Sequence, residues 1–122
     1  MAGVVVTGGV LTCSHKGRAK LSSGDSRLTV DGKAAVVSGH EVGVSFATGS
    51  PGVDVPCNFK TNAGPSPCTA TVAATAGVST KLTVGGLGVL LDNATGTAVN
   101  TIDGSATWSV ADAGQSKLTT DG

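Results

Sequence analysis

The feature that most constrains this chain is a strand-turn-strand phrase that occurs twice and begins a third time. The two complete copies run from Arg27 to Ser38 and from Lys81 to Asp92, at an offset of 54 residues, and a partial copy runs from Lys117 to Gly122. Each copy has a basic residue, Leu-Thr and a turn with Gly; in the complete copies a second apolar run follows, the pattern of a hairpin with a two-residue loop. Two or three such hairpins around one axis predict a compact wedge with pseudo-symmetry. Chance reuse of a good hairpin phrase is the alternative.

Short β-like runs bounded by glycine fill the rest of the chain, and the glycines leave no amphipathic helical period. The predicted strands are Val4–Thr7, Arg27–Val30, Ala34–Ser38, Val42–Phe46, Thr69–Ala73, Lys81–Val84, Val89–Leu91 and Thr107–Val110. Only Thr75–Thr80 has a composition that allows a short turn of helix. We therefore predict an all-β fold with very little helix, in a single domain over residues 1–122.

Composition excludes several classes of protein. With 19 Gly and 4 Pro among 122 residues, and only two Phe and one Trp as aromatic side chains, a large aromatic core is ruled out. Charged residues make up 13% and the eight cations balance the eight anions, so nothing predicts binding to nucleic acid. The first ten residues have neither the basic start nor the apolar run of a secretory signal, so we expect synthesis in the cytoplasm without a signal peptide.

Three cysteines and two histidines supply the first chemical signal. An odd number of thiols cannot all pair within one chain, whereas thiols accompanied by histidines are an ordinary setting for zinc. Cys13 and His15 are two residues apart, so an extended strand would point both side chains to one face. Cys57 and Cys68 bracket a loop that contains proline, and His40 follows the first hairpin. These five side chains are the candidate ligands.

Each candidate ligand also has a simpler interpretation. Cys13 is small enough to be an ordinary buried residue, His40 in a Gly-rich turn is typically solvated, and a disulfide between Cys57 and Cys68 is the main alternative to a metal. Cys13 and His15 could form a nucleophile pair, but the chain has no nucleophile elbow and no phosphate-binding glycine loop. We therefore do not predict an enzyme.

Four segments of the chain resemble the PAAR (Pro-Ala-Ala-Arg) and PAAR-like proteins. These proteins are the spike tips of contractile injection systems, which include type VI secretion systems, extracellular phage-tail-like particles and phage tails. The segments are Val6–Gly17, Val30–Gly39, Ser66–Cys68 and Val84–Leu91, within a resemblance that spans Val4 to Asn93.

Two segments can be compared with the family's motifs residue by residue. The segment Thr12-Cys-Ser-His-Lys-Gly17 looks like the family's early Thr-x-His-Gly-Gly loop, with His15 at the ligand histidine and Lys16 in place of a glycine. The family's signature is absent, since Lys33-Ala-Ala-Val36 stands where Pro-Ala-Ala-Arg would be.

The resemblance implies a small conical domain of short antiparallel β-hairpins with a pseudo-threefold repeat. It also implies a structural Zn²⁺ near the apex, held by Cys13, His15, Cys57 and Cys68, with His40 as the alternative fourth ligand to Cys13. Such a protein caps the trimeric β-helical spike of the injection system, one tip per trimer, and sharpens it for piercing the target envelope.

The implied partners are therefore the spike trimer, transiently the target membrane, and an effector or cargo where one is attached. The tip would be assembled on a contractile phage-tail-like particle in the cytoplasm and delivered to the target. Val4–Val6 and Trp108–Leu118 are candidates for contact with the spike, although Trp108 itself is better suited to packing under the last hairpin.

Two other functions compete with the spike tip. A β-rich secreted adhesin or glycan-binding module without a piercing role would suit the Ser- and Thr-rich strands, but surface aromatics for sugar stacking and an export signal are missing. A thiol-based enzyme would lose turnover on alkylation.

Overall fold

The computed structural model describes residues 2–47, 50, 52–57, 60–61, 64–65, 68–100 and 106–120. Within these residues the regular elements are all strands, every named strand pair is antiparallel, and no helix is present that could cross a membrane. The strands are β1 (Ala2–Gly3), β2 (Val10–Cys13), β3 (Arg18–Lys20), β4 (Asp25–Val30), β5 (Lys33–Ala35), β6 (Val53–Val55), β7 (Lys60–Thr61), β8 (Gly64–Pro65), β9 (Ala70–Thr71), β10 (Ala76–Val84), β11 (Leu87–Val99), β12 (Thr107–Asp112) and β13 (Thr119–Thr120). The predicted all-β fold class is confirmed.

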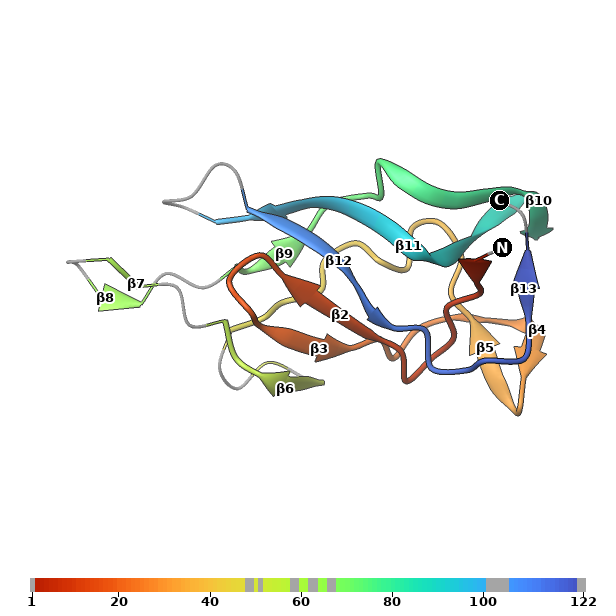
Figure 1. Cartoon of the computed structure of the whole chain (residues 1–122), viewed down its shortest axis with the longest axis horizontal. Helices are drawn as coiled ribbons and strands as arrows, with labels where there is room; N and C mark the ends of the chain where they lie inside the picture. The colour runs from red at the N-terminus through yellow and green to blue at the C-terminus, as the bar shows by residue number, and fades with distance from the viewer. Residues whose placement is uncertain are drawn as a thin grey trace.

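The largest sheet runs in the order β10-β11-β12-β2-β3-β6, with β9 paired to the far part of β11, and it curls along the length of the molecule (Figure 1). Trp108 of β12 pairs with Cys13 of β2 and is 1% exposed. Its Nε1–H donates to the carbonyl of Val72 at 2.8 Å, as a buried indole N–H requires. The predicted packing role of Trp108 is confirmed.

The two complete copies of the repeated phrase form matching hairpins. Val30 pairs with Lys33 across the turn Asp31-Gly32, and Val84 pairs with Leu87 across Gly85-Gly86. All four turn residues have positive φ, from 54° at Asp31 to 84° at Gly86. Positive φ at both central positions defines a type I′ turn, which matches the twist of the flanking strands and favours Asp-Gly and Gly-Gly.

The partial third copy forms the counterpart of a third hairpin, in which the last described strand, β13, pairs with the first, β1. In β1–β13, Gly3 pairs with Thr119 and Ala2 with Thr120. These pairs repeat the register of Ala34 with Thr29 and Lys33 with Val30 in β4–β5, and of Gly88 with Thr83 and Leu87 with Val84 in β10–β11. Three equivalent leucines, Leu28, Leu82 and Leu118, pack against the same small core. The internal repeat is therefore structural and not a chance reuse of residues.

The segments that follow these hairpins close a triangle. Val6 bridges Ala35, Val37 bridges Val89, and Leu91 bridges Val4, so each of the segments 4–6, 35–37 and 89–91 pairs with the other two. Their central residues form a ring of backbone hydrogen bonds. The amide of Val36 donates to Val5, Val5 to Leu90 and Leu90 to Val36, at 2.8, 2.9 and 2.8 Å. A cyclic arrangement of this kind is pseudo-threefold.

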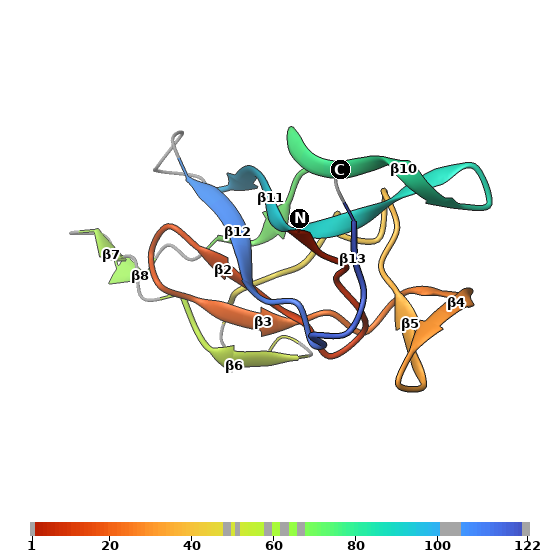
Figure 2. The same cartoon turned by 45° about the vertical axis from the view of Figure 1, so that its right-hand side comes forward.

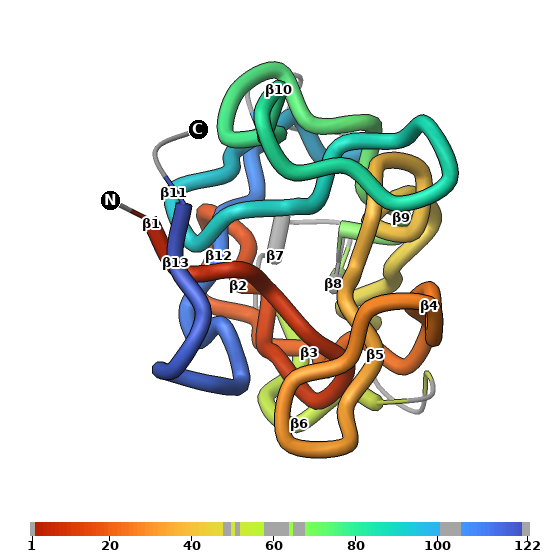
Figure 3. Tube along the Cα trace, turned by 90° about the vertical axis from the view of Figure 1, so that its right-hand side faces the viewer, coloured from red at the N-terminus to blue at the C-terminus, as the bar shows by residue number. Residues whose placement is uncertain are grey.

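Contacts between the hairpins follow the same cyclic order. The Lys117 ammonium pairs with Asp31 in the β4–β5 turn at 2.8 Å, and the Arg27 guanidinium lies against Gly85 in the β10–β11 turn. Figure 3, which faces this end of the molecule, shows β10, the β4–β5 hairpin and the β1–β13 pair arranged around its centre. Figure 2 shows β4–β5 and the turn of β10–β11 projecting at the end away from β7 and β8. We call this surface the three-hairpin end.

Some predicted strands are wrong in extent or in kind. Val42–Phe46 is turn and coil, because Gly43 has a φ of +83° and the amides of Gly43 and Val44 donate to Thr71 instead of to a strand ladder. Val4–Thr7 contributes bridges to the triangle and not a continuous strand. Thr75–Thr80 forms no helical turn, since β10 begins at Ala76.

Candidate metal centre

Four of the five candidate ligands converge at the end of the sheet opposite the three-hairpin end. The ligand atoms of Cys13, His15, Cys57 and Cys68 all lie within 4.8 Å of one another. The β2–β3 turn carries two of them, and it lies on the left of Figure 1 while β4–β5 and β1–β13 lie on the right. The three cysteines are buried and His15 is half-buried. The described chain therefore has a compact Cys₃His group that could bind a metal ion.

Cys13 and His15 are placed by the tight turn between β2 and β3. β2 ends at Cys13, so His15 lies in the turn and not on an extended strand as the two-residue spacing predicted. The amide of Lys16 donates to the Cys13 carbonyl at 3.0 Å, and Lys16 itself has a φ of +69°. A type I turn followed by a left-handed residue has this geometry. The turn places the His15 ring within 4.8 Å of the Cys13 thiol.

Gly17 ends the β2–β3 turn and lies against Cys13 and Cys57 of the cluster. Its N–H donates to Cys13 Sγ at 3.2 Å, and its carbonyl accepts from the Cys13 amide at 3.0 Å and from Thr12 Oγ1 at 2.8 Å. A Cβ at this position would lie 3.0 Å from Cys13 Sγ and 3.0 Å from both N and Cα of Cys57. The close approach of Cys57 to this turn therefore favours glycine at position 17.

Cys57 and Cys68 are brought together by Phe46, which is fully buried. The Cys57 amide donates to the Phe46 carbonyl at 2.8 Å, and the Phe46 amide donates to the Cys68 carbonyl at 3.0 Å. The two sulfur atoms lie 3.9 Å apart, and no disulfide joins the three cysteines, all of which belong to the described residues. Asn100 Nδ2 lies 3.8 Å from Cys68 Sγ and directs a donor at it.

Two of the distances between the ligand atoms match the edges of a tetrahedral zinc site, and all four atoms lie within 4.8 Å of one another. Zn–S bonds of about 2.3 Å and Zn–N bonds of about 2.0–2.1 Å at the tetrahedral angle separate two sulfurs by about 3.8 Å and a sulfur from a nitrogen by about 3.6 Å. The structure has 3.9 Å between Cys57 and Cys68 and 3.5 Å between Cys68 Sγ and His15 Nδ1. Thiolates and imidazole are also the donors that zinc prefers.

Burial favours the protonated form of Cys13 and Cys68 when no cation is bound. It raises the pKa of Cys68 to about 12, and it also raises the pKa of Cys13, against the hydrogen bonds from the backbone that stabilise the thiolate. A divalent cation reverses this preference, because its positive charge compensates the negative charge of the buried thiolates. Ion binding to this group must therefore release protons.

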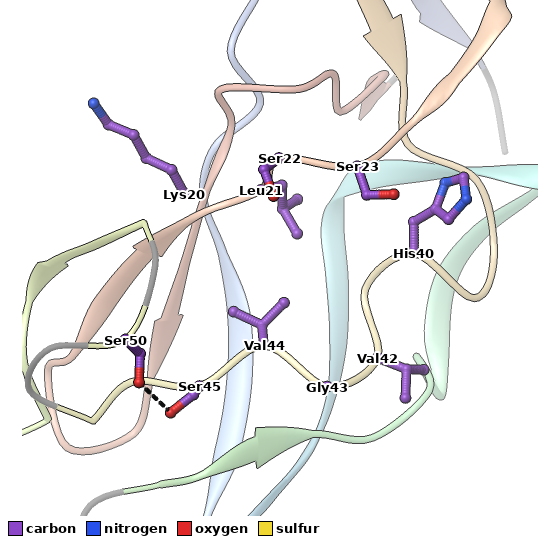
Figure 4. Close-up of a pocket in the computed structure, with 10 residues that line it drawn as sticks. All are labelled: Lys20, Leu21, Ser22, Ser23, His40, Val42, Gly43, Val44, Ser45 and Ser50. Atoms are coloured by element: carbon purple, nitrogen blue, oxygen red, sulfur yellow. Dashed lines mark hydrogen bonds between the residues drawn. The ribbon is translucent and has the colours of Figure 1, made fainter.

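His40 is not a member of the cluster. It lines a pocket of about 300 Å³ with Lys20, Leu21, Ser22, Ser23, Val42, Gly43, Val44, Ser45 and Ser50 (Figure 4). In the described chain, His40 Nδ1 and Oε2 of the buried Glu41 are buried atoms without a hydrogen-bond partner. The structure thus brings Cys13, and not His40, to the other three candidates.

Sequence reasoning missed the residues that support the ligands. Nothing in the pattern indicates that Gly17 faces Cys57, that Phe46 holds two ligand segments, or that Asn100 approaches Cys68. The strand Val53–Val55, which leads to Cys57, was also not predicted.

Comparisons with protein-family models, with curated proteins and with solved structures found no match to this chain.

Proposed function

We propose that this chain is the tip of a trimeric spike in a contractile injection system, with one end braced by zinc and the other seated on the spike. The observation that carries the proposal is the pseudo-threefold end, where the segments 4–6, 35–37 and 89–91 pair cyclically. One chain can match the end of a trimer in three places only if it presents three equivalent elements. The PAAR resemblance of the sequence supports the same assignment.

The thiol cluster supports the proposal from the other end of the molecule. Residues 58–67 connect Cys57, which follows β6, to Cys68, which precedes β9, while Cys13 ends β2 and His15 lies in the turn after it. Zinc held by Cys13, His15, Cys57 and Cys68 would join these three segments, and its binding free energy would become folding free energy. Zinc at the thiol cluster would give a small domain that must resist force the rigidity that its small core does not supply.

A binding experiment tests the proposal directly. The full chain is mixed with the trimeric β-helical spike protein of a contractile system from the same genome, and the complex is weighed by native mass spectrometry. We expect one chain per spike trimer. No complex, or three chains per trimer, would overturn the proposal.

Two substitutions on opposite ends of β11 locate the contact. Leu87, 48% exposed, lies beside the β10–β11 turn, whereas Val99, 45% exposed, pairs with Ala70 near the thiol cluster. Both side chains are exposed, so replacement by Asp leaves the core intact. Leu87→Asp should weaken capture by the spike and Val99→Asp should not; equal effects would count against the three-hairpin end as the seat.

A further inference from the structure

We infer that the metal centre is also a peroxide-sensitive switch, in which oxidation joins Cys57 to Cys68 and releases the metal. This inference rests on the metal site of the proposed function. It starts from the two sulfur atoms, which lie 3.9 Å apart in the chain that has no disulfide. A disulfide needs about 2.05 Å, so the sulfurs must approach by roughly 1.8 Å.

The three thiols differ in how freely they can make that approach. Cys13 ends β2 in the interior of the sheet, where Trp108 is its partner on one side and the Gly17 carbonyl accepts its amide on the other. Its sulfur also accepts the Gly17 N–H at 3.2 Å. Cys57 and Cys68 lie outside the named strands, after β6 and before β9. The pair that can close with the least disturbance of the sheet is therefore Cys57 with Cys68.

Exposure sets the order of the two steps. Both residues are buried, but Cys57 is 7% exposed and Cys68 is 0% exposed, so we assign the first reaction with a small oxidant to Cys57. The Cys57 thiolate attacks one oxygen of hydrogen peroxide, the O–O bond breaks, and sulfenic acid and hydroxide form. The Cys68 thiolate then attacks the Cys57 sulfur and displaces a second hydroxide. The two sulfurs together lose two electrons to the peroxide, and both oxygens leave as water after protonation.

The disulfide removes two of the four ligands. Cys13 and His15 remain, and two ligands do not hold zinc in a structural site that needs four. Because the chain has three cysteines, one disulfide leaves one thiol, and the geometry assigns that thiol to Cys13.

Zinc-loaded full chain treated with hydrogen peroxide tests the inference, with metal release followed by a chromophoric chelator and the cysteines mapped by differential alkylation and peptide mass spectrometry. We expect one zinc released per chain, a Cys57–Cys68 disulfide, and Cys13 as the one alkylated thiol. Thiol reductant with added zinc should restore the loaded form. A disulfide that contains Cys13, or zinc retained while the thiols are oxidised, would overturn the inference.

Two variants make the result specific. Under the same peroxide treatment, with zinc added as for the parent so that the thiols are ionised, Cys13→Ser retains both partners and should form the disulfide, whereas Cys68→Ser should stop at a Cys57 sulfenic acid that dimedone traps. If Cys13→Ser forms no disulfide, the pairing is wrong. A chain that never takes up zinc contradicts the proposed function as well, whereas a loaded chain that keeps its zinc under peroxide contradicts only this switch.

Discussion

Gly17→Ala is the substitution that most sharply tests how the metal centre is built. The added Cβ would lie 3.0 Å from Cys13 Sγ and 3.0 Å from backbone atoms of Cys57, whereas ordinary contacts begin at 3.4 Å. The Cys57 backbone is held by its hydrogen bond to Phe46, so relief of the contact moves the ligands apart by a few tenths of an ångström. Overpacking of this kind costs about 1–3 kcal/mol, which corresponds to about 5- to 160-fold in an equilibrium constant.

We therefore expect Gly17→Ala to bind zinc more weakly than the parent chain, by up to about 160-fold, because the metal-free chain can relax the contact between Cys13 and Cys57 that the loaded chain must keep. Gly17 does not have a positive φ, so alanine adds no backbone strain of its own. The assay is a competition titration against a chromophoric zinc chelator. Gly8→Ala is the control, because Gly8 has a φ of +90° with open space around it and should lower stability without changing zinc affinity. Parent-like affinity in Gly17→Ala would refute the close packing described for this turn.

Three further predictions follow from the same structure. Removing zinc from a chain held at free zinc about 1,000-fold above its Kd should cost about 4 kcal/mol, and with about 2.1 cal/mol/K of unfolding entropy for each of 122 residues the melting temperature should fall by about 16 °C in a calorimetric scan. Zinc affinity measured by titration should rise with pH near neutrality, because buried thiols with raised pKa values release protons on binding, and a pH-independent affinity would contradict the thiolate ligands. Leu90→Ala at the centre of the triangle should lower the free energy of unfolding by about 2–5 kcal/mol in urea, whereas exposed Leu87→Ala on the same strand should change it by less than about 1 kcal/mol.

The raised pKa of Cys68 also fixes the sign of a stability change at high pH. The folded metal-free chain holds this proton up to about 12, whereas the unfolded chain releases it near the ordinary value of 9.0. Stability from this group is therefore complete below pH 9 and is lost as pH rises toward 12. Chemical denaturation of the metal-free chain at pH 8 and pH 10 should show the loss, and Cys68→Ala should reduce it.

The parts of the fold that the sequence predicted are those coded by local rules. Asp31-Gly32 and Gly85-Gly86 fit type I′ turns and little else, so both hairpins and their equivalence could be read from the repeated phrase. The Cys/His set was found because few residue types bind zinc, and the odd number of thiols argued against a disulfide framework.

What the sequence could not predict depends on contacts between distant segments. Val42–Phe46 is apolar enough for a strand, but its amides find Thr71 and Cys68, so it becomes the loop that holds two ligands. The triangle of residues 4–6, 35–37 and 89–91 joins three segments that lie far apart in the sequence, and no local pattern marks that closure. The choice between Cys13 and His40 was equally a question of tertiary packing.

The metal content of the purified full chain tests the central claim most directly. Inductively coupled plasma mass spectrometry on chain purified under reducing conditions without added chelator should find one zinc per chain, and Cys57→Ser or Cys68→Ser should lose it while His40→Ala keeps it. A parent chain that is metal-free, or that carries zinc which His40→Ala removes and Cys68→Ser does not, would contradict the account.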